Sequence, residues 1–128
     1  MKKLNLMALL FGLSLFTSHV SADITLQSAD EVQGTWNLKY SKNSLTDKQP
    51  INREDIWVFK EGKLTILHIP RDGIYYDQPP VSYAVEDGKL KVAIVGSSRV
   101  DLYTVTEKDA KNMTLKGKYG NYYFFSQK

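Results

Sequence analysis

The chain has 128 residues, with 17 basic and 14 acidic side chains and no cysteine. The absence of cysteine excludes disulfides, thiol catalysis and thiolate metal sites. The net charge of +3 falls to +1 once Lys2 and Lys3 are removed with the leader described next, so the chain lacks the concentrated basic stripe that a nucleic-acid partner requires. This length is typical of one domain with a modest core.

Residues 1–22 have the pattern of a secretory signal peptide. Positive charge at Lys2 and Lys3 precedes an apolar run from Leu4 to Phe16, and Val20-Ser21-Ala22 supplies small residues where a signal peptidase cuts. The apolar run is too short to span a bilayer as a helix, and a lipoprotein anchor would need a cysteine. We therefore expect cleavage after Ala22 and a periplasmic or secreted protein without a stable membrane anchor.

An N-terminal arm is expected over residues 23–33. Within it, Ser28 and Glu31 have the spacing of a capping box, in which each residue satisfies a free N–H group of the other at a helix start. This spacing predicts a single helical turn at 29–33.

The next segment has the alternation of a strand. Over residues 35–40, Trp36, Leu38 and Tyr40 share one face and polar residues share the other, which is typical of a half-buried antiparallel strand. The polar segment 41–53 that follows is expected to be a loop.

The remainder of the chain has the pattern of further strands and turns. Strands are predicted at 55–60, 63–69, 73–77, 81–86, 90–95, 100–106, 113–119 and 122–127. Asp87-Gly88 is the strongest hairpin pattern, whereas Pro79-Pro80 is expected to end the short strand before it. This spacing predicts an all-β domain over 34–128, and specifically an antiparallel up-and-down barrel of about eight strands, because closure removes exposed sheet edges.

Several of these residues carry a resemblance to a known family. Gly34-Thr35-Trp36, at the start of the first predicted strand, resembles the G-x-W motif of lipocalins and of the shorter bacterial lipocalin-like domains, which are small β-barrels of the calycin type. The body of those domains is similar to Trp57-Val58-Phe59 with Gly62, to Tyr83 and to Asp87-Gly88-Lys89-Leu90. The resemblance spans roughly residues 31–128. The bacterial META domain also opens with a G-x-W-like strand, but its Gly-Cys-Asn segment has no counterpart here.

The resemblance implies a structural role for Trp36 and a difference at the C-terminus. In the family this tryptophan packs in the barrel floor, so we expect Trp36 to be part of the core. Full-length lipocalins also have a C-terminal helix and an arginine that covers the tryptophan, and neither is found before Ser126-Gln127-Lys128. The resemblance therefore does not specify what covers the closed end of the barrel, or whether a ligand pocket of the family is kept.

Five residues are candidates for the barrel interior and for ligand binding. Alternation places Trp57, Phe59, Tyr83, Ile94 and Tyr103 on inward faces of their strands. The interior of an eight-stranded barrel is either just filled by side chains or holds one small ligand.

Catalytic and metal-binding patterns are weak. His68 is the only histidine after the leader, and its phase matches the inward-facing Leu64 and Ile66, but one histidine is not a metal site. Glu54 and Asp55 are adjacent, so a strand would point them to opposite faces, and no serine lies in a G-x-S-x-G motif. We expect no cofactor, no metal and no enzymatic activity.

The surface offers three further features. In Tyr122-Tyr123-Phe124-Phe125 alternation leaves two aromatic rings outside, either covered by the N-terminal arm or forming a partner surface. Tyr75 and Tyr76 precede Pro79-Pro80 at a rim of the predicted barrel. Basic residues are locally concentrated in one segment only, at Lys108, Lys111, Lys116 and Lys118. We expect these lysines to lie on a solvated outer face.

The sequence therefore predicts a non-enzymatic binding protein with two alternative modes. The first is capture of a small apolar or amphipathic ligand inside the barrel. The second is a protein-binding module, such as an inhibitor, an immunity-type protein or an envelope assembly factor, that uses the outer aromatic rings or the loop at 41–53. An internal cavity would favour the first mode, and a filled interior with an exposed aromatic patch would favour the second.

Overall fold

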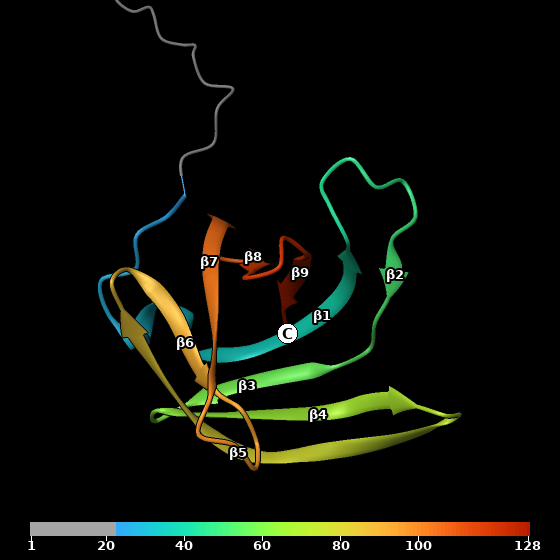
Figure 1. Cartoon of the computed structure of the whole chain (residues 1–128), viewed down its shortest axis with the longest axis horizontal. Coiled ribbons are helices and arrows are strands. Elements are labelled where there is room, and N and C mark those ends of the chain that lie inside the picture. Colours follow the sequence, from blue (N-terminus) through green and yellow to red (C-terminus); the bar gives the residue numbers. More distant parts are fainter. Residues whose placement is uncertain (1–22) are drawn as a thin grey trace, which may run out of the picture.

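The computed structural model describes residues 23–128, so the predicted leader and its cleavage after Ala22 lie outside the described residues. One turn of 3-10 helix, η3 (Ala29–Val32), precedes β1 (Gly34–Lys42), β2 (Ile51–Asn52), β3 (Ile56–Lys60), β4 (Lys63–Arg71), β5 (Ile74–Glu86), β6 (Lys89–Ala93), β7 (Val100–Lys108), β8 (Asn112–Gly117) and β9 (Tyr122–Gln127). The sheet order is β2-β1-β3-β4-β5-β6-β7-β8-β9, and β9 also pairs with β1. The predicted fold class is confirmed: eight antiparallel strands close into a barrel, with the short β2 added beside β1 (Figure 1).

One strand is longer than predicted. We expected separate strands at 73–77 and 81–86, but β5 is continuous over 13 residues and includes Pro79-Pro80. β5 pairs with β6 only from Tyr83 onward, and its ladder with β4 has two register shifts. The two prolines therefore lie where one edge of β5 is unpaired and the other ladder is irregular, which is where strands tolerate proline.

Three tight turns of the same kind join neighbouring strands. Glu61-Gly62, Asp72-Gly73 and Asp87-Gly88 each have positive φ at both residues, 52° and 78°, 51° and 83°, and 54° and 79°. Two positive φ angles are typical of the type I′ turn, whose twist matches that of a hairpin. The hairpin predicted at Asp87-Gly88 is thus confirmed, whereas the prediction that Gly73 begins a strand is wrong, because Gly73 completes a turn.

Because the strands alternate in direction, their connections gather at two ends of the barrel. We call the end formed by residues 43–50, 53–55, 72–73, 94–99 and 118–121 the loop end. The turn between β4 and β5 belongs to it and projects farthest to the right in Figure 1. The N-terminal arm, η3 and the remaining turns lie at the opposite, closed end.

The N-terminal arm seals the closed end. The backbone N–H of Ile24 donates to the carbonyl of Val105 (2.7 Å), and that of Leu26 donates to the carbonyl of Gly88 (2.9 Å). Leu26 and Val32 are almost completely buried. The arm therefore extends the sheet beyond the start of β6 and inserts apolar side chains into the barrel.

The predicted helical turn is present and is held by its acidic residue. The Glu31 carboxylate accepts hydrogen bonds from the backbone N–H groups of Gln27 and Ser28. These bonds lower the pKa of Glu31, because they stabilise its charged form.

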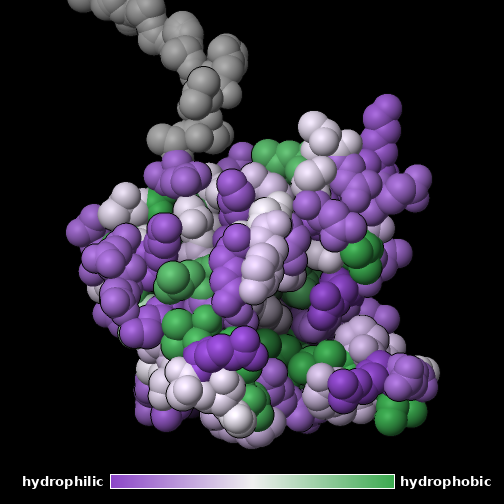
Figure 2. Space-filling view, in the orientation of Figure 1, coloured by the Kyte–Doolittle hydropathy of each residue, from purple (hydrophilic) through white to green (hydrophobic). Residues whose placement is uncertain are grey.

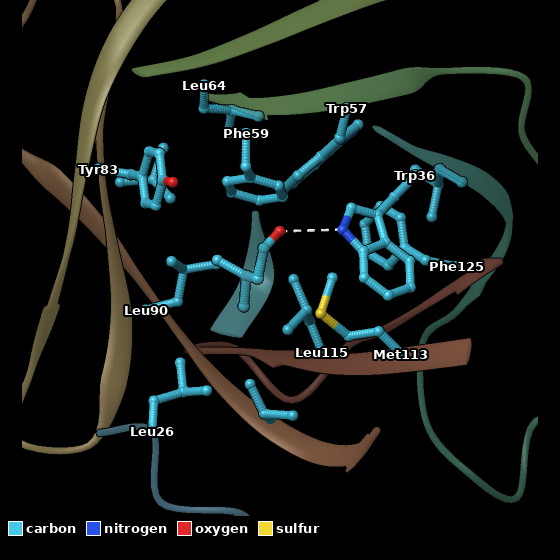
Figure 3. Packing of buried hydrophobic residues seen from close by; sticks show 14 residues of the cluster. Leu26, Trp36, Trp57, Phe59, Leu64, Tyr83, Leu90, Met113, Leu115 and Phe125 are labelled. Carbon is cyan, nitrogen blue, oxygen red and sulfur yellow. Dashed lines mark hydrogen bonds between the residues drawn. The ribbon is translucent and has the colours of Figure 1, made fainter. Parts of the chain in front are cut away.

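Trp36 lies at the centre of the core (Figure 3). Its side chain is 1% exposed, and its Nε1 donates to the carbonyl of Val32 at 3.0 Å. Lys108, at the end of β7, places its Nζ 5.6 Å from the ring centroid. A lysine thus covers the tryptophan. Lys108 is half-buried there and also lines an open cleft with Glu107 and Asp109, so it is less solvated than the predicted outer face implies.

His68 does not follow the predicted inward phase. It has a φ of 59° at one of the register shifts between β4 and β5, and its backbone N–H donates to the Asp77 carboxylate. Its ring stacks on Tyr75, with 3.7 Å between centroids, and is exposed. An irregular ladder shifts the alternation of side chains, so the phase of Leu64 does not extend to His68.

Candidate functional site

The predicted interior residues are largely brought together. Trp57, Phe59 and Tyr83 are buried, whereas Tyr103 and Ile94 are partly exposed. The Trp57 ring lies 6.1 Å from Phe59 and 5.9 Å from Tyr103, and Phe59 lies 5.0 Å from Tyr83. Four of the predicted residues thus form one aromatic cluster inside the barrel, while Ile94 follows β6 at the loop end.

The barrel is more tightly closed at one end than at the other. Inward-facing residues near the closed end, such as Leu64, Leu90 and Val105, have no measurable exposure. Those nearer the loop end, such as Ile66 and Tyr123, are partly exposed. The loop end is therefore the part of the interior that an outside molecule can approach.

Trp57 has an unusual polar atom. Its side chain is 5% exposed, yet its Nε1 has no hydrogen-bond partner among the described residues. Buried polar atoms in proteins nearly always have a partner. Trp57 is close to the start of β3, in the half of the barrel nearest the loop end.

Tyr103 contacts Trp57 and contributes an uncharged hydroxyl group to the interior of the barrel. Burial raises the pKa of Tyr103, and the nearby Asp101 carboxylate and Tyr123 raise it further. Both effects disfavour the phenolate. Tyr103 therefore stays protonated near neutral pH and offers binding rather than acid–base chemistry.

The exposed hydrophobic side chains gather at the loop end. Of eight large hydrophobic residues exposed among residues 23–128, three lie in the connections of the loop end and four lie beside these connections, in β2 and at the start of β5; the eighth, Leu102, lies in β7. We call these seven the loop-end patch: Leu45, Ile51, Ile74, Tyr75, Tyr76, Val95 and Tyr119. Figure 2 shows hydrophobic surface across the middle of the visible face and again at the lower right, where the β4–β5 turn lies in Figure 1.

The loop-end patch is electrically balanced. Basic and acidic residues of the loop end are equal in number: Lys48, Arg53, Arg99 and Lys118 against Asp47, Glu54, Asp55 and Asp72. Lys118 is 3.6 Å from Asp101. The patch therefore has no net charge to attract nucleic acid or an anionic lipid surface.

Glu54 and Tyr75 fix the projecting β4–β5 hairpin to the rest of the loop end. The Tyr75 hydroxyl donates to Glu54 Oε1 at 3.0 Å, which raises the pKa of Tyr75. His68 Nε2 is 3.9 Å from the same oxygen. The arrangement holds Tyr75 at the rim, where the sequence predicted it.

The two outer rings of β9 are only partly covered. Phe124 stacks on Tyr40, with 4.6 Å between centroids, and Lys42 lies 5.9 Å from the Phe124 ring. Lys116 lies 5.8 Å from the Tyr122 ring. The arm reaches this region through Asp23, which lines the same cleft as Tyr122, but both rings keep partial exposure.

Comparison with known proteins gives no relative: no protein-family model, curated protein or solved structure matches the chain. Residues 23–128 contain no group of three or more histidine, cysteine or acidic residues placed to hold a metal ion. None of the described helices is long and apolar enough to cross a membrane.

Sequence reasoning missed three of the seven residues of the loop-end patch. The three are Ile74, Val95 and Tyr119. A single apolar residue beside a turn is not part of an alternating pattern, so the sequence does not indicate that it belongs to a surface patch. One feature of the sequence could have identified two of them. Tyr119 and Ile74 are each next to a turn glycine, a position where polar residues are usual, so a large apolar residue there is unexpected.

Proposed function

We propose that this domain is a non-enzymatic binding protein that recognises a protein partner through the loop-end patch. The observation that carries the proposal is the concentration of exposed hydrophobic side chains at one end of the barrel, in three of its connections and in the adjoining parts of β2 and β5. Contiguous exposed apolar surface on a soluble domain marks an interaction site. Tyrosine-rich loops with balanced charge are typical of protein-recognition surfaces.

The packed aromatic cluster supports this choice over a ligand enclosed within the barrel. Trp57, Phe59 and Tyr83 fill the space beside one another, so a small molecule would have to displace them. The lipocalin-like resemblance stays a prediction, and the closed eight-stranded barrel is compatible with it.

The test is site-specific photo-crosslinking in cells that express the full chain. A photoreactive phenylalanine at Tyr119, which is 87% exposed, is expected to give one protein adduct of defined mass. Ile74→Lys should reduce that adduct at least tenfold, because a charge would have to be desolvated in the interface. The matched control is Leu102, exposed but away from the loop end.

The control separates specific docking from general stickiness. Leu102→Lys should leave the adduct from position 119 unchanged. Equal adducts from positions 119 and 102, an adduct of two copies of this chain, or crosslinks to lipid only would each contradict a dedicated protein partner.

A second candidate is an amphipathic small molecule seated above Trp57. The unpartnered Nε1 of Trp57 favours it, because a bound acceptor atom would satisfy that N–H group. Contact with Ile66 and Tyr103, which are partly exposed, would supply apolar area.

The second candidate predicts one-to-one binding of the uncharged dye Nile Red. Ile94→Trp is expected to weaken the dye at least tenfold without unfolding the barrel, because it adds a large ring at the loop end. A loss of stability of about 1–3 kcal/mol would instead show that the interior is already packed solid. Val95→Trp is the matched control, because Val95 is 45% exposed. Fluorescence titration and thermal melts measure both effects, and a lack of saturable binding to the unmodified chain would remove this candidate.

A further inference from the structure

A groove lies on the outer wall of the barrel, apart from the loop-end patch. The register pairs Glu107 with Thr114, Thr114 with Phe124, and Phe124 with Tyr40, across β7, β8, β9 and β1. Directly opposed residues share one face of a sheet. β7 and β1 each have a register shift next to this row, and such bulges redirect side chains.

The row forms the floor and one wall of an outer groove. One cleft of about 480 Å³ is lined by Tyr40 and Phe124 among others. A second, of about 460 Å³, is lined in part by Ile24 of the arm. Both share Thr114, which is 7% exposed. These volumes lie in the range of small-molecule sites.

The lining combines apolar rings with mixed polar groups. The stacked rings of Tyr40 and Phe124 provide the apolar part. Hydroxyl, amide and carboxylate groups come from Thr106, Asn112 and Glu107. The charges that line the two clefts are balanced, with Lys39 and Lys108 against Glu107 and Asp109.

We propose that the outer groove binds a neutral oligosaccharide. Balanced charge gives no net attraction for an ionic ligand. Sugar hydroxyls both donate and accept hydrogen bonds, so they suit a lining that offers hydroxyl, amide, carboxylate and ammonium groups. The apolar face of a sugar ring packs on aromatic side chains, which the Tyr40–Phe124 pair supplies.

A peptide fits the groove less well. An extended peptide gains most of its affinity by pairing its backbone with a free strand edge. Here β7, β8, β9 and β1 pair in one continuous ladder, so their backbone groups are already engaged. A peptide in the groove would leave its own N–H and C=O groups dependent on side chains alone.

The experiment is nuclear magnetic resonance titration of the chain from Asp23 to Lys128 with maltohexaose, cellohexaose and chitohexaose. We expect at least one sugar to give saturable shifts at the amides of Thr106, Thr114 and Phe124, and none at Tyr119. Glu107→Gln and Thr114→Val should each weaken that sugar at least tenfold.

Matched controls keep the test independent of folding. Thr65→Val makes the same change on β4, where Thr65 pairs with Val58, and should bind the sugar as the unmodified chain does. The proposal is overturned if none of the three sugars saturates, if the variants bind equally well, or if a blocked Ser/Thr/Asn octapeptide shifts the groove amides and the sugars do not.

Discussion

Replacing Trp36 by alanine is expected to lower the free energy of unfolding by about 3–5 kcal/mol. The side chain is 1% exposed, so its removal leaves a cavity in the middle of the core. It also leaves the carbonyl of Val32 without the Nε1 donor that it has at 3.0 Å, which costs more than the bond itself contributes. A domain of this size has roughly 5–15 kcal/mol of stability in total.

Urea denaturation followed by Trp57 fluorescence measures the effect. Trp36→Phe should lose less than Trp36→Ala, because it keeps most of the apolar contact but not the N–H donor. Tyr119→Ala, at a position that is 87% exposed, should change stability by no more than about 0.5 kcal/mol. If Trp36→Ala melted like the Tyr119 variant, the central role of Trp36 in the core would be wrong.

The second large effect is expected at the Arg53–Asp55 ion pair. Asp55 accepts two hydrogen bonds from the Arg53 guanidinium, at 3.0 and 2.6 Å. The side chain of Asp55 is 4% exposed and that of Arg53 is 28% exposed. Arg53→Met would therefore leave a buried carboxylate unpaired, and we expect a loss of about 3 kcal/mol.

The reverse change should cost less, and that asymmetry is the test. Asp55→Asn leaves a guanidinium that water can still reach, and the double variant Arg53→Met with Asp55→Leu removes both charges, so it is expected to be closer to the unmodified chain. Chemical denaturation of the three variants compares them. Equal losses for Arg53→Met and the double variant would show that the unpaired carboxylate is not the cause.

The Arg53–Asp55 pair also illustrates what sequence reasoning could not provide. Glu54 and Asp55 were expected to point to opposite faces of a strand, but both lie in the connection before β3, where Glu54 is exposed and Asp55 is buried. The burial of Asp55 depends on the backbone between β2 and β3. There Leu38 donates its N–H to the carbonyl of Asp55, and Arg53 donates its N–H to the carbonyl of Lys39. Those contacts join residues that are distant in the chain.

Alternation along the chain was reliable where ladders are regular. It placed Trp36 and Leu38 in the core, and the structure agrees. It also placed Tyr40 on the same face, which is wrong, because Tyr40 lies beyond a register shift between β1 and β9 and stacks on the outer ring of Phe124. It failed at His68, where the β4–β5 ladder shifts register. A single extra residue in one strand moves every side chain beyond it to the opposite face of the sheet. The local sequence does not indicate where such a residue is inserted.

By itself, the sequence determined that residues 34–128 form an all-β barrel, that a helical turn precedes it and that Trp57, Phe59, Tyr83 and Tyr103 point inward. These features depend on local alternation and turn chemistry, which neighbouring residues specify. Only the tertiary structure decided that those rings contact one another inside the barrel, that Trp57 keeps an unpartnered N–H group, and that exposed hydrophobic residues from distant segments lie at the same end of the sheet. Each of these depends on which distant strands are paired and in what register, and that is settled only when the sheet closes.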